Sequence, residues 1–205
     1  MKSVAGTAAL GAALLLGCGL AAVPAQADYI VTLTQAGSNV VATGSGTIDL
    51  TGLSSVGSGG SIAYVEPDAA GINTGPATFV ASSFYRGYTG PASFGSGFLT
   101  LASSGSGDIV GIGAFGADGD LAVPSGYASG SALSDTSTYD GATFASLGLT
   151  PGTYTWTWGS GPADGSFMLD VETTAVPEPG SLALLGIGLL GLGLAGFASR
   201  RRLVG

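Results

Sequence analysis

Short stretches of alternating apolar and polar residues, broken every few positions by glycine, proline or aspartate, recur between residues 28 and 175. The clearest is Thr153–Trp158, where aromatic residues alternate with threonines and therefore share one face of an extended strand. After the loop 159–165, the apolar residues of 167–171 again lie at alternate positions. The two apolar rows face each other in a hairpin, so this pair of strands is expected to anchor the core.

Further strands are predicted by the same alternation, at residues 29–33, 40–43, 47–50, 97–101, 108–112 and 121–123. Gly44–Gly46 is interpreted as a bulge or bend, the run 103–107 as the turn of a hairpin, Pro124–Gly126 as a turn, and Leu53–Ser61 as a mobile loop. No long run has the apolar spacing of a helix. We therefore predict an all-β fold, an antiparallel β-sandwich or jelly-roll-like domain.

Residues 1–27 predict a signal peptide that is removed on export. Lys2 precedes an apolar segment, and Ala25 and Ala27 supply the small residues that signal peptidase requires before a cut at Asp28. Cys18 lies in a context that loosely resembles a lipobox, so a lipidated N-terminus is the alternative. The apolar run beyond Cys18 and the complete site after it favour ordinary cleavage.

The predicted domain, residues 28–175, carries twelve acids and one cation, Arg86, for a net charge of about −11. Such a surface repels phosphate, so nucleic acid is not an expected partner. The chain has no histidine, and its single cysteine lies in the signal peptide. These absences exclude imidazole triads, thiol nucleophiles, ordinary zinc sites and, after cleavage, disulfides.

The C-terminal region, 176–202, has three parts in order. Residues 176–181, Val-Pro-Glu-Pro-Gly-Ser, predict a stiff tether, because proline fixes φ and removes a backbone donor. Residues 182–198 are uncharged and rich in leucine and glycine, and their length predicts a transmembrane helix. The cluster Arg200, Arg201 and Arg202 predicts a stop-transfer signal that stays in the cytoplasm.

This arrangement resembles the PEP-CTERM sorting domain of Gram-negative bacteria, a tail that is also catalogued as an ice-binding protein C-terminal domain. The resemblance covers 176–202 and implies an exosortase-type membrane protease as partner, with Val176, Pro177, Glu178 and Pro179 as the sorting and cleavage motif. It also implies an inner-membrane intermediate with the domain in the periplasm. Cleavage would then deliver the domain to the outer surface or to an exopolysaccharide matrix.

The domain offers no catalytic constellation, so we expect a non-enzymatic surface or matrix protein without a cofactor or metal. Two carboxylate pairs suit glycoside hydrolysis in principle, Asp135 with Asp140 and Glu66 with Asp68, but are best explained as solvated loop acids. The run 118–120, Asp-Gly-Asp, is interpreted as a turn rather than a calcium site. Arg86 is expected to form a surface ion pair.

Two alternative functions stay open. A carbohydrate-binding module, with exopolysaccharide as its ligand, needs exposed aromatic residues, whereas Trp156 and Trp158 are expected in the core. An ice-binding protein needs a flat, threonine-rich face, for which Thr153, Thr155 and Thr157 supply one short row that no sequence repeat extends.

Overall fold

The computed structural model describes residues 27–113, 119–160 and 165–172, and in these residues the chain is all-β. The strands are β1 (Ala27–Ala36), β2 (Asn39–Thr47), β3 (Ser54–Ser61), β4 (Tyr64–Glu66), β5 (Gly71–Thr74), β6 (Val80–Arg86), β7 (Thr100–Leu101), β8 (Ser104–Gly107), β9 (Val110–Ile112), β10 (Leu121–Pro124), β11 (Ala132–Tyr139), β12 (Gly152–Trp158) and β13 (Gly165–Val171). One 3₁₀ turn, η1 (Pro67–Ala69), separates β4 from β5.

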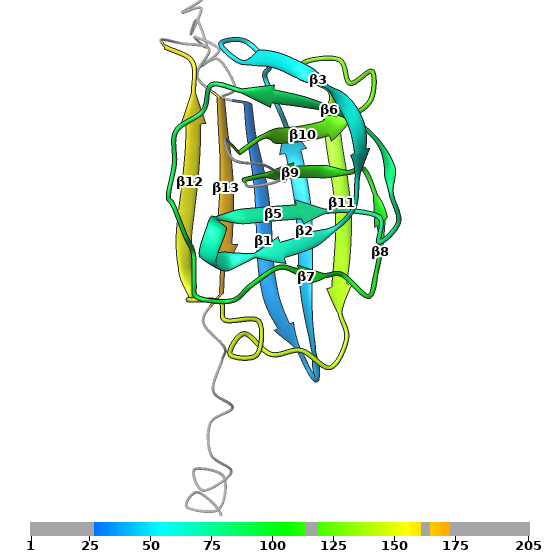
Figure 1. The fold of residues 1–205 in the computed structure, drawn as a ribbon, viewed down its shortest axis with the longest axis vertical. Helices are drawn as coiled ribbons and strands as arrows, with labels where there is room; N and C mark the ends of the chain where they lie inside the picture. The colour runs from blue at the N-terminus through cyan, green and yellow to red at the C-terminus, as the bar shows by residue number, and fades with distance from the viewer. Residues whose placement is uncertain (1–26, 114–118, 161–164, 173–205) are drawn as a thin grey trace, which may run out of the picture.

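These strands form two sheets that lie one over the other, with the strands of one layer running across those of the other (Figure 1). The six-stranded sheet has the order β12-β13-β1-β2-β11-β8, and the seven-stranded sheet has the order β3-β6-β10-β9-β5-β4-β7. The predicted all-β class is therefore confirmed, as are the strands at 29–33, 40–43 and 121–123 and the turn after Pro124.

One strand pair departs from the antiparallel prediction. β1 and β13 pair in parallel, with Tyr29 beside Phe167 and Leu33 beside Val171, whereas every other pair of described strands is antiparallel. The first and last described strands therefore lie side by side as the third and second strands of the six-stranded sheet. Because they run in the same direction, Ala27 and Glu172 lie at opposite ends of the domain (Figure 1).

The core lies between the two sheets and contains most of the large aromatic side chains. The bulkiest fully buried residues are Trp156, Tyr29, Tyr64, Tyr139, Phe94 and Phe167. They come from strands of both sheets and from the connection after β6. Each large aromatic ring removes roughly 150–250 Å² from water, so these few residues supply much of the apolar burial.

The β12–β13 hairpin is confirmed with the predicted inner faces. Trp156 pairs with Phe167, and their rings meet edge to face with centroids 5.7 Å apart. The outer edge of β12 is covered by the connection between β6 and β7, because Thr89 and Thr157 exchange two backbone hydrogen bonds of 2.9 and 2.8 Å. Covering an edge in this way leaves fewer unpaired backbone groups for another chain to pair with.

The predicted break at Gly44–Gly46 is wrong, because β2 runs without interruption through these residues to Thr47. Glycine is needed there for close approach. A Cβ atom on Gly44 would lie 2.2 Å from the Tyr29 hydroxyl oxygen, and one on Gly46 would lie 2.1 Å from the Asp28 carbonyl oxygen. The predicted strand at 47–50 is correspondingly absent beyond Thr47.

The hairpin predicted from 97–101 and 108–112 is also wrong. The run 103–107, interpreted as its turn, contains β8, which pairs with β11 in the six-stranded sheet. Its neighbours β7 and β9 belong to the seven-stranded sheet. The chain therefore passes from one layer to the other and back within this short segment.

The segment Leu53–Ser61, predicted as a loop, instead forms the edge strand β3 along β6. Two of its glycines leave room for the aromatic rings of nearby residues. A Cβ atom on Gly59 would meet the Phe84 ring at 3.2 Å, and one on Gly60 would meet the Phe79 ring at 3.3 Å. Cross-strand contact with an aromatic ring thus stabilises a segment with little side-chain bulk of its own.

Candidate functional site

The predicted sorting residues lie outside the part of the chain that the structure describes. This applies to the motif 176–179, to the arginines 200–202 and to Ala25 of the signal peptidase site. Ala27 is the first residue of β1, where its backbone pairs with Gly165. Within the described ranges no helix is long and apolar enough to cross a membrane. The described residues therefore bear on the domain between the two predicted signals.

The two tryptophans are core residues, as the sequence predicted. Trp156 is 1% exposed and Trp158 is 3% exposed. The Trp158 indole Nε1 donates a hydrogen bond of 2.7 Å to the Asp49 carbonyl oxygen, and the Trp156 ring lies over Gly90, where a Cβ atom would come within 2.2 Å of it. Neither ring presents a face to solvent, so neither offers a stacking platform for a sugar.

The acids proposed as catalytic pairs do not converge on a cleft. Asp135 points into the core from β11, whereas Asp140 lies beyond the end of that strand and is exposed. Asp68 is exposed on η1 and Glu66 is half-buried at its start. Partial burial and the nearby Asp68 carboxylate raise the pKa of Glu66. The pair at Asp135 and Asp140 is thus divided between the core and the solvent.

Arg86 forms the predicted ion pair. Its Nε lies 2.5 Å from Oδ1 of Asp120, with side-chain exposures of 39% and 15%. Asp120 belongs to the run weighed as a calcium site; Asp118 lies outside the described residues. No group of three or more potential metal ligands occurs in the described ranges. A carboxylate that already neutralises a guanidinium is a weak start for a calcium site, which needs six to eight oxygen ligands.

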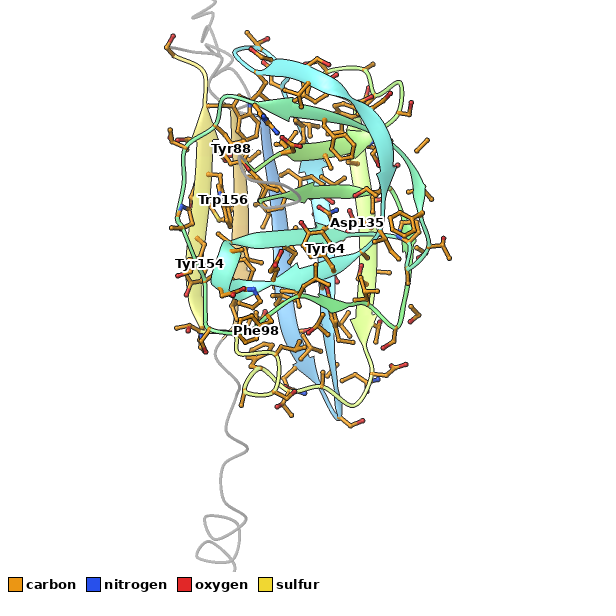
Figure 2. The ribbon with its side chains drawn as sticks, in the orientation of Figure 1. Tyr64, Tyr88, Phe98, Asp135, Tyr154 and Trp156 are labelled. Atoms are coloured by element: carbon orange, nitrogen blue, oxygen red, sulfur yellow. The ribbon has the colours of Figure 1, made fainter. Side chains whose placement is uncertain are left out.

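The most unusual polar group in the domain is a carboxyl buried between the two sheets. Asp135, which is labelled in Figure 2, is 6% exposed. Its Oδ2 accepts a hydrogen bond from the hydroxyl of Tyr29, which is fully buried on β1. Its other oxygen, Oδ1, has no hydrogen-bond partner among the described residues. Gly44, which pairs with Asp135 from the intervening strand β2, leaves open the space that both side chains occupy. The arrangement holds an acid where only a neutral carboxyl is well accommodated.

Burial raises the pKa of Asp135 from 3.8 to about 6, although the hydrogen bond from Tyr29 acts in the opposite direction. Burial also raises the pKa of Tyr29, and the adjacent Asp135 carboxylate adds to this effect. Both groups are therefore neutral in mildly acidic solution. Because both side chains are buried, we expect the ionisation of this pair to affect the stability of the domain.

Of the polar contacts near Asp135, one links the six-stranded sheet to the residue after β5, and another lies within the seven-stranded sheet. Ser137, the next inward residue of β11, donates a hydrogen bond of 2.9 Å to the Gly75 carbonyl oxygen and accepts one of 2.8 Å from the Gly75 amide. Thr74, at the end of β5, donates to the Val110 carbonyl oxygen at 3.2 Å. Sequence reasoning missed this polar strip. The sequence signal was that residues 133, 135, 137 and 139 of β11 all lie on its inner face. This alternation is hard to recognise because the residues between them are also polar.

The outer face of the six-stranded sheet presents hydroxyl groups. Thr153, Thr155 and Thr157 lie exposed on β12, as the sequence predicted for one row. The strand register adds what no sequence repeat supplies, because threonines and serines from β1, β2, β11 and β8 lie in line across the sheet. The sequence pattern predicts only the row on β12, because the rest of the face is assembled from the β1–β2 hairpin and the separate strands β8 and β11.

No protein family, curated protein or solved structure matches the chain. The fold and the site therefore define the protein only by class. It is an all-β domain of two layers, with a buried acid between the sheets and a hydroxyl-rich face on one of them.

Proposed function

We propose that this chain is an exported, non-enzymatic protein of the cell surface or of the exopolysaccharide matrix, sorted by an exosortase-type protease that recognises its tail. In this proposal residues 1–27 direct export, 182–198 span the inner membrane transiently, and cleavage near the motif 176–179 releases the domain. In this proposal the domain is a jelly-roll-like sandwich of two mainly antiparallel sheets, and it performs no chemistry.

The proposal that the domain is not an enzyme rests mainly on one observation: of the candidate acids Asp135 and Asp140, the first is buried and the second is exposed. A glycoside hydrolase needs two carboxyl groups that face each other across one bond, about 5 to 10 Å apart. Asp135 is enclosed by the core and bonded to Tyr29, while Asp140 faces solvent. The acid with the most perturbed pKa is thus inaccessible to a substrate.

The position of the last described residues supports delivery from a membrane tether. β13 ends beside the start of β12, where Val171 pairs with Gly152. Phe98, which is 78% exposed, lies at the same end of the domain (Figure 2). Leu99 and Leu101 beside it are 42% and 51% exposed. Exposed Phe and Leu side chains suit the interfacial zone of a bilayer, next to which the proposed tether would hold this end.

The test replaces the three residues of the motif, Pro177, Glu178 and Pro179, by alanine in the full chain, which carries a tag directly after the signal peptide. We expect the unchanged chain to lose a small C-terminal mass and the substituted chain to accumulate in the inner membrane at the longer mass. Pro151→Ala, an exposed proline in the domain, is the matched control and should mature normally. Normal maturation of the triple-alanine chain contradicts the sorting proposal.

A further inference from the structure

The two sheets end in four edge strands, of which three are short or covered. The edge of β12 is covered by the bridge between Thr89 and Thr157, β7 has two residues and β8 has four. The fourth edge strand, β3, has eight residues, and none of them is charged or a proline. Short length, lysine, proline and cover are common means by which proteins keep an edge from pairing with another chain. β3 has none of these protections.

The backbone of β3 is unpaired on the side away from β6. Residues 54–60 are exposed, and among the described residues no backbone hydrogen bond joins β3 to a segment other than β6. A register shift between Ser55 and Gly57 interrupts the start of the strand, so that residues 57–61 form its regular part. Every second residue of a regular edge strand directs its N–H and C=O groups away from the sheet. Residues 57–61 therefore offer backbone donors and acceptors to another strand.

Aromatic rings flank this edge on both faces. The Phe84 ring lies against Gly59, where a Cβ atom would come within 3.2 Å of it, and the Phe79 ring lies against Gly60 at 3.3 Å. Successive residues of a strand face opposite ways, so the two rings lie on opposite faces of β3. Phe79 is 69% exposed. A strand added at this edge would cover apolar surface as well as pair with the backbone.

A second copy of β3 matches the geometry of this edge. In an antiparallel pair, residues whose backbone groups point at the partner strand lie opposite each other, and such residues alternate along each strand. A strand that pairs with its own copy therefore places one residue opposite itself, on a two-fold axis. An axis at Gly59 uses all of residues 57–61 and sets Ser58 opposite Gly60 of the second copy. No side chain in this part is larger than that of serine, so the two backbones can approach without a clash.

The same axis brings the flanking rings of the two copies together. The two Gly59 residues lie opposite each other, each with a Phe84 ring against it on one face. On the other face the two Gly60 residues, each with a Phe79 ring against it, are diagonal neighbours at roughly 7–8 Å. Aromatic side chains reach each other across such distances. The exposed Phe79 ring thus has an apolar partner in the second copy.

Charge permits this contact even though the domain is acidic. β3 and β6 contain no acid, and the cation of β6, Arg86, is paired with Asp120 at 2.5 Å. Two acidic domains still repel each other at a distance, over roughly 30 Å at about 0.01 M salt and roughly 10 Å at about 0.1 M. Contact through an uncharged edge should therefore strengthen as the salt concentration rises. Binding of an oppositely charged partner would weaken under the same change.

We propose that the β3 edge binds a second copy of this chain, antiparallel about Gly59, so that the two seven-stranded sheets join into one. A contact through one edge strand is small beside the roughly 1,200–2,000 Å² buried in stable complexes, so the dimer is reversible. β3 lies toward the end of the domain opposite Glu172, which leaves the C-terminal end free (Figure 1). The proposal concerns the described domain and does not depend on the tail or its cleavage.

The first experiment joins the two copies through a cysteine. Ser58→Cys is introduced into the full chain in mild detergent, together with Cys18→Ser, so that it supplies the only thiol of the chain. Ser58 is exposed, and the proposed axis makes the two residues 58 diagonal neighbours on one face. A short bismaleimide should therefore yield a covalent dimer. Ser106→Cys in the same background, exposed on the β8 edge, is the matched control and should stay monomeric.

The second experiment is sedimentation equilibrium of the full chain at increasing concentration. The dimer fraction should rise between about 0.01 M and about 0.1 M salt, because the repulsion between the acidic domains is then screened. Phe79→Ser should lower the association constant roughly tenfold, since both rings of the pair are lost. Phe98→Ser, which replaces a ring that is 78% exposed at the other end of the domain, is the control and should leave the constant unchanged.

Unfolding in urea, followed by fluorescence of the two buried tryptophans, shows that each variant is folded before it is compared. A monomer at every concentration and salt overturns the proposal, as does equal cross-linking of Ser106→Cys or unchanged association of Phe79→Ser. Species larger than a dimer also overturn it, because a two-fold contact closes on itself. The sorting experiment reads maturation instead, so the two proposals fail independently.

Discussion

Replacing the buried acid by its neutral isostere, Asp135→Asn, should remove one component of the pH dependence of folding. The carboxyl is 6% exposed, and burial raises its pKa from 3.8 to about 6. Below about pH 4 the carboxyl is protonated in both states. Between about pH 4 and 6 the unfolded chain releases its proton while the folded chain keeps it, so stability falls as the pH rises. Above about pH 6 both states are ionised and the loss is complete.

The size of this loss follows from the pKa values. At 1.36 kcal/mol per pH unit, a carboxyl whose pKa moves from 3.8 to about 6 lowers the free energy of unfolding by roughly 3 kcal/mol across the range. That is a large share of the 5–15 kcal/mol typical of a domain. The asparagine side chain of the variant cannot ionise, so the variant should gain about this much relative to the unchanged chain between pH 4 and pH 8.

The assay is urea unfolding at pH 4, 5, 6, 7 and 8, followed by tryptophan fluorescence, because both tryptophans are buried and report on the core. The informative quantity is the change with pH of the difference between the two chains, since the other acids contribute equally to both. Asp140→Asn, an exposed acid just beyond the same strand, is the control and should parallel the unchanged chain. If Asp135→Asn also parallels it, the buried carboxyl is not the titrating group and the reasoning fails.

Two further predictions concern neighbouring contacts. Gly44→Ala places a methyl group 2.2 Å from the Tyr29 hydroxyl oxygen and should lower the free energy of unfolding by about 1–3 kcal/mol. When it is combined with Tyr29→Phe, the loss should be smaller than the sum of the two single losses. Additive losses in this double-mutant cycle would contradict the contact. Trp158→Phe keeps an aromatic ring but removes the hydrogen-bond donor to the Asp49 carbonyl oxygen. Urea unfolding should therefore show that the free energy of unfolding falls by about 1–3 kcal/mol. An unchanged midpoint would mean that water replaces the indole as donor.

Local patterns were sufficient to predict the β12–β13 hairpin and its buried face. In Thr153–Trp158 the alternation is strict, and Trp156 and Trp158 are large enough for their inner position to follow from apolar area alone. The same holds for β1, whose inward residues include Val31 and Leu33. Where inner and outer residues differ strongly in polarity, period two identifies both the strand and its faces.

The buried acid and the hydroxyl-rich outer face of the six-stranded sheet were not predictable in this way. The position of Asp135 in the core depends on Tyr29 and Gly44, which are remote in sequence and meet it only through the register of three strands. On the outer face, Thr32, Thr43 and Thr136 lie in line, and no sequence repeat predicts this alignment. Registers between distant strands arise from the packing of the whole sheet, so the alternation along β11 identifies neither the partners of Asp135 nor the line of threonines.

The misplaced hairpin at 97–112 shows why serine and glycine predict turns poorly in this chain. Gly105 of β8 lies where the two sheets approach, and a Cβ atom on it would come within 2.0 Å of the Gly75 carbonyl oxygen. Gly75 in turn exchanges two hydrogen bonds with Ser137 on β11, so three segments meet within van der Waals contact. A larger residue at 105 would separate the layers at this corner. Glycine is required at this position by the short distance between the sheets. The high content of glycine and proline in the chain is therefore compatible with a packed core.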